Sequence, residues 1–254
     1  MGPGRMTPLG IYVVAGRPHS LSTRSLPSMN ACPLEVLYED NHLLALSKPA
    51  GLPTMGTAAA IPTLLAIAKE YVKGRYRKPG NVYLGVVSRL DAPVTGVVLL
   101  ARTSKAARRL TDQFRGGAVQ KTYWAIVEGS VRPCSGTCVD WVGKDERHRR
   151  MHIVGPTLSG AQEARLSYRR IASVGHDSLL EVRLETGRKH QIRLQLAHRG
   201  YPILGDRKYG SQRRWPAGIA LHARRLVVSH PVRGVPLELE APLPAAWRSF
   251  GVVG

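Results

Sequence analysis

The chain has 254 residues, with 37 lysines and arginines against 17 aspartates and glutamates, and a formal net charge of +20 at pH 7. This length allows a sizeable buried core, and the positive excess favours a polyanionic partner, because neutralising phosphates releases counterions. The sequence has three cysteines and no run of 18 apolar residues, so neither a disulfide scaffold nor a transmembrane span is expected.

Residues 1–33 differ in composition from the rest of the chain. They contain no acidic residue, three arginines and several serines. Such a segment is expected to be a disordered tail. The alternatives are a transit peptide for a mitochondrion or plastid, because these segments are rich in Arg and Ser and poor in acid, or a true start at Met29. The folded domain is predicted over residues 34–254, in a cytoplasmic protein unless the transit peptide applies.

The first half of the predicted domain alternates strands with helices. Two strands at 34–39 and 42–48 flank the turn residues Asp40 and Asn41, which predicts a hairpin. Near-continuous apolar runs predict strands that are covered on both faces. The further predicted elements are a helix at 61–72 with Pro62 in its first turn, strands at 82–87 and 94–101, a helix at 103–114 and a strand at 121–127.

The second half is richer in strands. Residues 131–165 are basic and contain glycines, and we expect a ribbon of short strands there. Later elements are predicted as strands at 165–171 and 180–185, a helix at 188–198 ended by Gly200, and strands at 221–228 and 237–241. Many strands with few helices predict an α+β domain built on a mixed, mostly antiparallel central sheet with flanking helices.

The turn between two buried strands carries an isolated carboxylate, Asp91. An aspartate before Ala-Pro is most simply a turn former. At the end of a rigid sheet, however, its side chain could project into a cleft, and Arg89 and Arg193 offer cationic partners. An arginine within about 4–6 Å would keep the carboxylate ionised, as a nucleophile or base requires.

Three segments together resemble the RluA-type pseudouridine synthases, which isomerise uridine within RNA. They are Ser88-Arg89-Leu90-Asp91 with Val94-Thr95-Gly96, Lys121-Thr122-Tyr123, and Thr186-Gly187-Arg188-Lys189-His190-Gln191-Ile192-Arg193. The likeness covers roughly residues 34–245. The chain departs from the family at Ser88, where a histidine is usual, and at Val94-Thr95, where the family has Thr-Ser. We find no counterpart of the S4-type RNA-binding module of many relatives.

The resemblance implies a pseudouridine synthase-like fold with a catalytic cleft, and it implies roles for seven residues. Asp91 corresponds to the catalytic aspartate, and Arg193 to the arginine that pairs with it. Tyr123 corresponds to the tyrosine that stacks on the target base and is a candidate for assisting proton removal from C5. The implied substrate-binding residues are Arg89, which helps displace the target base, and Leu194, Arg188 and His190.

The implied function is an RNA pseudouridine synthase that isomerises specific uridines in rRNA or tRNA. The expected partner is RNA, and the protein is expected to be a monomer without cofactor, metal or membrane. The sequence leaves open which RNA and which uridine are modified. It also leaves open whether Asp91 acts by covalent attack or by proton abstraction.

Two other hypotheses are weighed against this one. A catalytically inactive RNA-binding or ribosome-assembly protein on the same fold is the main rival, and the departures at Ser88 and Val94-Thr95 speak for it. A zinc-dependent nucleic-acid binder is the second, because Cys134, Cys138, His148 and His152 approach a zinc-finger spacing.

Overall fold

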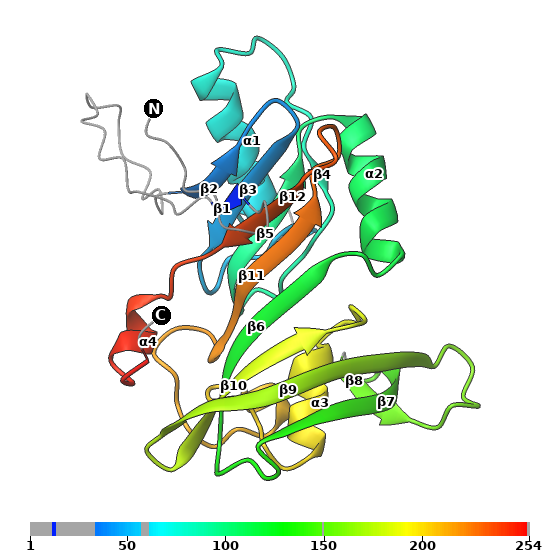
Figure 1. Cartoon of the computed structure of the whole chain (residues 1–254), viewed down its shortest axis with the longest axis vertical. Helices are drawn as coiled ribbons and strands as arrows, with labels where there is room; N and C mark the ends of the chain where they lie inside the picture. Colours follow the sequence, from blue (N-terminus) through cyan, green and yellow to red (C-terminus); the bar gives the residue numbers. More distant parts are fainter. Residues whose placement is uncertain (1–11, 14–33, 57–60, 149, 253–254) are drawn as a thin grey trace.

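One long, twisted sheet runs through the molecule, and helices pack against it (Figure 1). The computed structural model describes residues 12–13, 34–56, 61–148 and 150–252. The strands in this part are β1 (Tyr12–Val13), β2 (Glu35–Glu39), β3 (Leu43–Lys48), β4 (Gly85–Val86), β5 (Thr95–Ala101), β6 (Gln120–Val127), β7 (Ser135–Asp145), β8 (Arg150–Val154), β9 (Gln162–Val174), β10 (Asp177–Leu184), β11 (Leu221–Ser229) and β12 (Pro236–Glu240). The helices are α1 (Leu64–Arg75), α2 (Ser104–Arg115), α3 (Gln191–His198), α4 (Ala245–Arg248) and the 3-10 turn η1 (Arg207–Tyr209).

The sheet is mixed but mostly antiparallel. Its strand order is β2-β3-β5-β11-β6-β10-β9-β7-β8, with β12 beside β11, β1 beside β12, and β4 beside β5. Among the described strands, only the β5–β11 and β1–β12 pairs are parallel. This confirms the predicted α+β class and the predicted character of the sheet.

Strand β5 is buried along its whole length, as its continuous apolar run predicted. Its side chains alternate between the two faces of the sheet. Leu99 packs in one apolar cluster with Leu110 of α2, whereas Leu100 packs in another with Leu64 of α1. The two helices therefore cover opposite faces of this half of the sheet. The loop that precedes β5 is consequently attached to a strand that is packed on both sides.

The starts of α1 and α2 are set by side-chain caps. Thr63 Oγ1 accepts the backbone N–H of Ala66 at 3.2 Å, so α1 begins after Thr63 and the predicted place of Pro62 in its first turn is wrong. Thr103 Oγ1 caps α2 in the same way. The predicted start of α2 is thus confirmed to within a residue.

Two strand predictions needed correction. The strand expected at 82–87 shrinks to β4, which pairs only with the last two residues of β5. The irregular ribbon expected at 131–165 is instead formed largely by the long strands β7 and β9 with β8 beside them. Strand β9 pairs with β10 on one side and β7 on the other, and these contacts sustain it well beyond the predicted 165–171.

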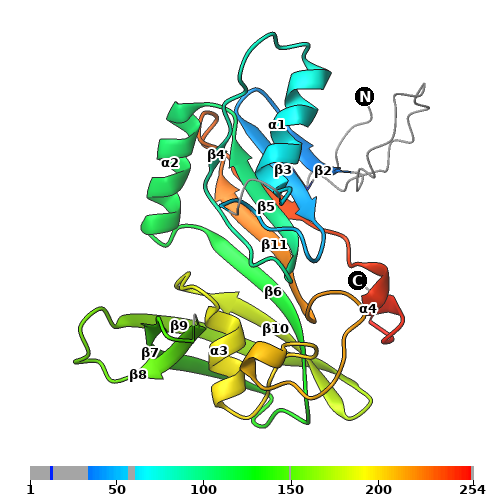
Figure 2. The same ribbon diagram turned by 180° about the vertical axis from the view of Figure 1, so that it is seen from behind.

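Helix α3 starts three residues later than the predicted 188–198. His190 has φ 56°, in the left-handed region that a right-handed helix does not allow, so the helix begins at Gln191. Figure 2 shows α1 and α3 in front of the sheet, with the starts of β5 and β11 between them.

The predictions for residues 1–33 fall outside the described residues except at β1, where Tyr12 pairs with Leu237 and Val13 with Glu238. Within the part of the chain that is described, no helix has the length and apolar character needed to cross a membrane.

Candidate active site

The loop that carries Asp91 is fixed by its own backbone. The N–H of Val94 donates to the carbonyl of Asp91 at 3.0 Å, which closes a tight turn. The carbonyl of Ala92 accepts from the N–H of Gly51 at 2.8 Å, and that of Pro93 accepts from the N–H of Ile219 at 3.2 Å. The turn is therefore held from two segments that lie far apart in the sequence.

Lys48 makes a third contact that holds the loop. This lysine is 1% exposed, and its Nζ donates to the carbonyls of Pro49, Leu52 and Ala92 at 2.8, 2.7 and 2.9 Å. Burial lowers the pKa of Lys48 to about 8, and the nearby Asp91 charge opposes that shift. The sequence pattern indicated no role for this residue, and its only signal there was the Lys48-Pro49 step that ends the first hairpin.

Two glycines let the backbones around this loop meet. Gly96 has φ 114°, and a Cβ there would lie 2.2 Å from the carbonyl oxygen of Ala223. Gly218 has φ 71°, and a Cβ there would lie 2.2 Å from the carbonyl oxygen of Pro93. Only glycine fits either position, so the starts of β5 and β11 approach closely on both sides of Asp91.

Arg193 lies between two carboxylates. Its Nη1 donates to Asp91 Oδ2 at 2.8 Å, while its Nε and Nη2 donate to Asp206 Oδ2 and Oδ1 at 2.6 and 2.8 Å. The side chains of Arg193 and Asp206 are 6% and 1% exposed, and that of Asp91 is 28% exposed. Burial alone would lower the pKa of Arg193, but the bonds and charges of the two carboxylates outweigh it and raise that pKa. The guanidinium therefore stays charged.

Asp206 was missed as a functional candidate. The segment Pro202-Ile203-Leu204-Gly205-Asp206 extends the likeness to the family, but the sequence predicted no structural element there and indicated no role for Asp206. A bidentate bond to a buried arginine is a long-range contact between α3 and the residue before η1, and no local pattern signals it.

A pocket opens beside Asp91, between the loop, β6 and α3. Six of the predicted site residues line it: Asp91, Tyr123, Arg193, Arg89, Arg188 and His190. Apolar lining comes from residues that include Val94, Leu184 and Leu221. Leu194 lies outside this lining. It packs instead with Val142, Met151 and Ala164, under the strands β7 to β9.

Tyr123 presents its ring to the pocket from β6, in register with Val182 of β10. Burial raises the pKa of Tyr123, and the charge of Asp91 adds to that shift. The phenol therefore keeps its proton at neutral pH. It can stack on a base or donate a hydrogen bond, but a free phenolate is disfavoured.

The remaining predicted residues differ in how firmly they are held. Arg188 donates through Nε to the carbonyl of Glu163 at 2.9 Å, whereas Arg89 is exposed and forms no ion pair with any described residue. His190 is nearly buried, and its Nε2 lies 3.6 Å from Asp91 Oδ2. The site thus concentrates cationic side chains around one partly exposed carboxylate.

The cysteines and histidines of the zinc hypothesis serve other contacts. Cys138 is buried in the core, and Cys134 Sγ accepts from Arg170 Nη2 at 3.1 Å. His148 contacts the carboxylate of Asp145. Across the described ranges, no three His, Cys, Asp or Glu side chains are grouped so as to hold a metal ion.

Comparison with known proteins places this fold among the pseudouridine synthases. The human RNA pseudouridylate synthase domain containing 4 superposes with a TM-score of 0.70 at 26% identity, covering 85% of this chain and 93% of that one. A model of the RNA pseudouridylate synthase family matches residues 42–198, and the chain belongs to this family of RNA-modifying isomerases.

Bacterial relatives agree. An uncharacterized RNA pseudouridine synthase of Synechocystis sp. is 36% identical over 227 residues, which span 86% of this chain and 68% of the relative. The ribosomal large subunit pseudouridine synthase D of Xanthomonas campestris pv. campestris is 35% identical over 241 residues, or 88% of this chain and 70% of the relative. The predicted family and the predicted enzyme class are thus confirmed.

Proposed function

We propose that the protein converts specific uridines of ribosomal or transfer RNA to pseudouridine, with Asp91 as the catalytic carboxylate. The observation that carries this proposal is the 2.8 Å bond from Arg193 to a carboxylate that remains partly exposed in a pocket. A buried, permanently charged partner holds one oxygen of the carboxylate, while the exposure of Asp91 leaves it accessible to a nucleotide.

The reaction balances without a co-reactant. The bond between N1 of uracil and C1′ of the ribose breaks, the base turns, and a bond forms between C5 and C1′. The proton on C5 is released and N1 gains one, so the product is an isomer of the substrate. Asp91 acts at the ribose, either by attacking C1′ or by removing a sugar proton, and both routes require the ionised form.

The other pocket residues handle the displaced nucleotide. Tyr123 supplies an aromatic platform for the unstacked base, which is the ordinary way in which proteins hold a flipped base. Arg89, exposed at the pocket, fills the space that the base leaves in the RNA. The name of the Xanthomonas relative supports large-subunit ribosomal RNA as the first substrate to test.

The first prediction concerns Asp91. Asp91→Asn removes the charge but keeps the shape, and we expect pseudouridine formation to fall on the order of 1000-fold, because the reacting group is lost. The measurement is pseudouridine mapping in total RNA from cells that lack the gene, after complementation with each variant. The matched control is Asp112→Asn, an exposed carboxylate on α2, which should behave as wild type.

Two results would contradict the proposal. Full activity of Asp91→Asn would show that another group does the chemistry. Tight RNA binding by the wild-type protein with no pseudouridine at any position would favour the inactive RNA-binding rival.

A further inference from the structure

The carboxylate of Asp91 is held at one oxygen. Arg193 Nη1 and His190 Nε2 both approach Oδ2, at 2.8 and 3.6 Å. No side chain or backbone group among the described residues donates to Oδ1. Because the two oxygens of a carboxylate exchange by rotation about one bond, fixing one of them determines where the other points.

His190 is in turn held by Tyr209. The Tyr209 hydroxyl oxygen lies 2.7 Å from His190 Nδ1, and it accepts the backbone N–H of Met151 at 3.2 Å. The two rings meet edge to face at 5.6 Å, and the Arg193 guanidinium lies 5.1 Å from the centre of the Tyr209 ring. Tyr209 therefore contacts both groups that hold Asp91.

The direction of these bonds follows from counting protons. Met151 has only an N–H to offer, so the Tyr209 oxygen must be the acceptor in that contact. Among the described residues, the acceptor within hydrogen-bond distance of that hydroxyl is the Nδ1 of His190, and the hydroxyl donates to it when this nitrogen carries the lone pair. A neutral imidazole with a free Nδ1 bears its proton on Nε2, the nitrogen that faces Asp91.

We propose that Tyr209 and His190 are positioning residues of this site: the Tyr209 hydroxyl fixes His190 with its proton on Nε2, and His190 and Arg193 together anchor Asp91 Oδ2 so that Oδ1 faces the ribose. This inference rests on the proposed function of Asp91. It gives His190 a role beyond the substrate binding that the family resemblance implied. At 3.6 Å the Nε2 contact is longer than a hydrogen bond, and the proposal requires it to shorten when the nucleotide fills the pocket.

The surroundings of His190 keep it neutral. Burial lowers its pKa to about 4, against the pull of Asp91 and with the help of Arg193, Lys208 and Lys189. A neutral ring donates a hydrogen bond without placing a second full positive charge beside the carboxylate. The backbone at His190 is itself unusual, with φ 56°, and its carbonyl accepts from Leu194 at 2.9 Å, so the ring is presented from a fixed turn.

The kinetic test is Tyr209→Phe, which deletes one oxygen and keeps the ring against Arg193. We expect the single-turnover rate at saturating RNA to fall at least about tenfold, with the RNA concentration for half-saturation unchanged, because the variant impairs positioning and not binding. Tyr201→Phe is the matched control. It also removes a hydroxyl that accepts a backbone N–H, that of Arg132 at 3.4 Å, but away from the pocket, and it should leave both quantities unchanged.

A second pair of variants tests the Nε2 proton directly. His190→Gln retains an N–H donor and should recover more of the rate than His190→Leu, which has none. Equal single-turnover rates for these two variants would overturn the proposal. So would a Tyr209→Phe variant that changes only the RNA concentration for half-saturation and leaves the rate unchanged.

A spectroscopic readout separates this inference from the proposed function. The ring nitrogens of ¹⁵N-labelled histidine report the tautomer in the free protein, where we expect His190 to be neutral with its proton on Nε2 in wild type and mixed in Tyr209→Phe. A proton on Nδ1 in wild type would refute the inference even if Asp91→Asn is inactive. The predicted tautomer in a protein that forms no pseudouridine would refute the proposed function and leave the arrangement of His190 in place.

Discussion

A single guanidinium, that of Arg193, serves two carboxylates of unequal exposure. Asp206 takes the bidentate contact and is buried, while Asp91 takes one bond and remains open to the pocket. Burying a charge is costly unless it is paired, so we expect the Asp206 contact to support the fold, whereas the Asp91 contact serves the proposed chemistry. A lysine at this position could not make both contacts, because it lacks the planar fork.

The second prediction is for Asp206→Ala. It leaves the buried Arg193 without its bidentate partner, and we expect the free energy of unfolding to fall by about 3–5 kcal/mol. Denaturant unfolding of the free protein measures this. Glu146→Ala removes an exposed partner of Lys144 and should leave the unfolding midpoint unchanged. Equal midpoints for Asp206→Ala and wild type would show that Arg193 does not depend on this carboxylate.

At the scale of elements, β11 is tied to its neighbours by a buried histidine. His222 Nδ1 lies 2.8 Å from Thr95 Oγ1 of β5, and its Nε2 lies 3.3 Å from the carbonyl of Ala241. Burial lowers the pKa of His222 to about 4, despite its bond to Ala241. The histidine is therefore neutral wherever the protein is folded near neutral pH.

The third prediction concerns acid stability. His222 binds a proton near pH 6.5 in the unfolded chain but only near pH 4 in the folded chain. Protonation of the unfolded chain therefore lowers the free energy of unfolding as the pH drops from 6.5 toward 4, and this loss is absent above pH 6.5. The decrease due to this histidine is about 3 kcal/mol. Denaturant midpoints from pH 7 to pH 4 measure it, and His222→Gln should flatten the profile relative to the exposed His176→Gln. His190 contributes in the same sense, because burial also lowers its pKa to about 4. If the denaturant midpoints of His222→Gln and His176→Gln changed with pH in parallel, His222 would not be the source of the acid sensitivity.

The sequence predicts a helix or strand well when nearby residues determine its position, and poorly when contacts with distant segments determine it. The apolar run of β5 and the Thr103 cap of α2 are local signals, and both were found. The length of β9 depends on partners on both sides, and the left-handed His190 depends on its tertiary setting, so neither was predicted. In the site, motifs singled out Asp91 and Arg193, because each lies in a contiguous match to the family. Asp206, Tyr209 and Lys48 act through contacts with distant segments, which one sequence does not display.

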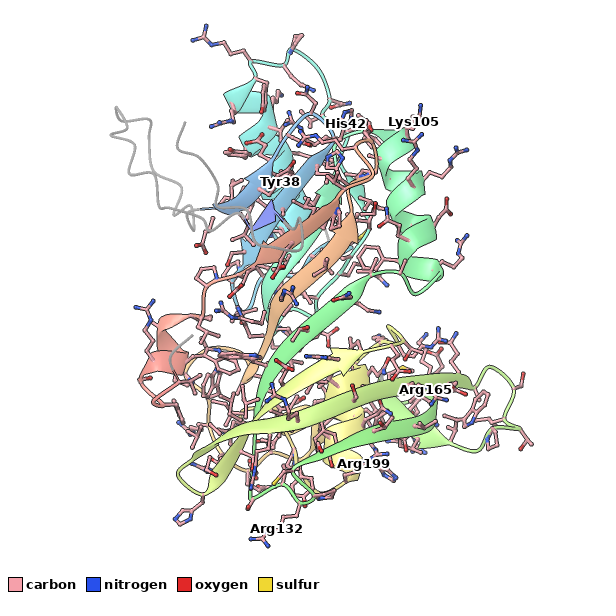
Figure 3. All side chains as sticks on the ribbon, viewed as in Figure 1. Tyr38, His42, Lys105, Arg132, Arg165 and Arg199 are labelled. Carbon is pink, nitrogen blue, oxygen red and sulfur yellow. The ribbon has the colours of Figure 1, made fainter. Side chains whose placement is uncertain are left out.

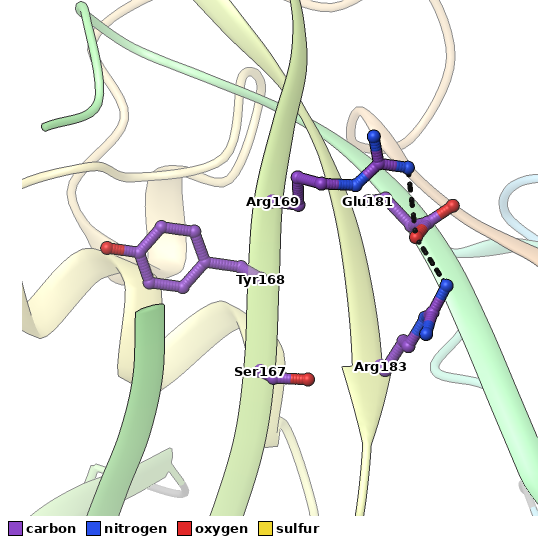
Figure 4. Close-up of a pocket in the computed structure, with 5 residues that line it drawn as sticks. All are labelled: Ser167, Tyr168, Arg169, Glu181 and Arg183. Atoms are coloured by element: carbon purple, nitrogen blue, oxygen red, sulfur yellow. Dashed lines mark hydrogen bonds and ion pairs between the residues drawn. The ribbon is translucent and has the colours of Figure 1, made fainter. Parts of the chain in front are cut away.

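At the scale of the whole molecule, basic side chains are spread along the sheet and helices, but they are not equally available (Figure 3). On the face of β9 and β10 that points away from Tyr123, Arg169 and Arg183 both contact Glu181 Oε1, at 3.5 and 3.1 Å (Figure 4). Arg89 at the pocket and the neighbouring Lys189 are exposed and form no ion pair within the described ranges. Uncompensated positive charge therefore lies beside the site, where a phosphate backbone would approach.

The fourth prediction compares two variants of equal net charge. Arg89→Gln with Lys189→Gln removes two cations near the pocket, and Arg169→Gln with Arg183→Gln removes two from the opposite face. We expect the first pair to weaken RNA binding and to reduce the slope of log affinity against log salt by about 0.7 for each phosphate of single-stranded RNA that is no longer neutralised. The second pair should bind as wild type does. Filter binding at several salt concentrations measures the affinity and the salt slope of both double variants. Equal effects of the two pairs would mean that RNA binding depends only on the total net charge of the protein.

The link from Met151 to Tyr209 is made by a main-chain amide and not by a side chain. Residue 151 can therefore be replaced during evolution by other apolar residues that fit the cluster of Val142, Ala164 and Leu194. The Tyr209 hydroxyl would still accept the backbone N–H of residue 151. Proline alone, lacking that hydrogen, would break the connection. The position can look unconstrained when related genes are compared, even though its backbone supports the tyrosine that contacts His190.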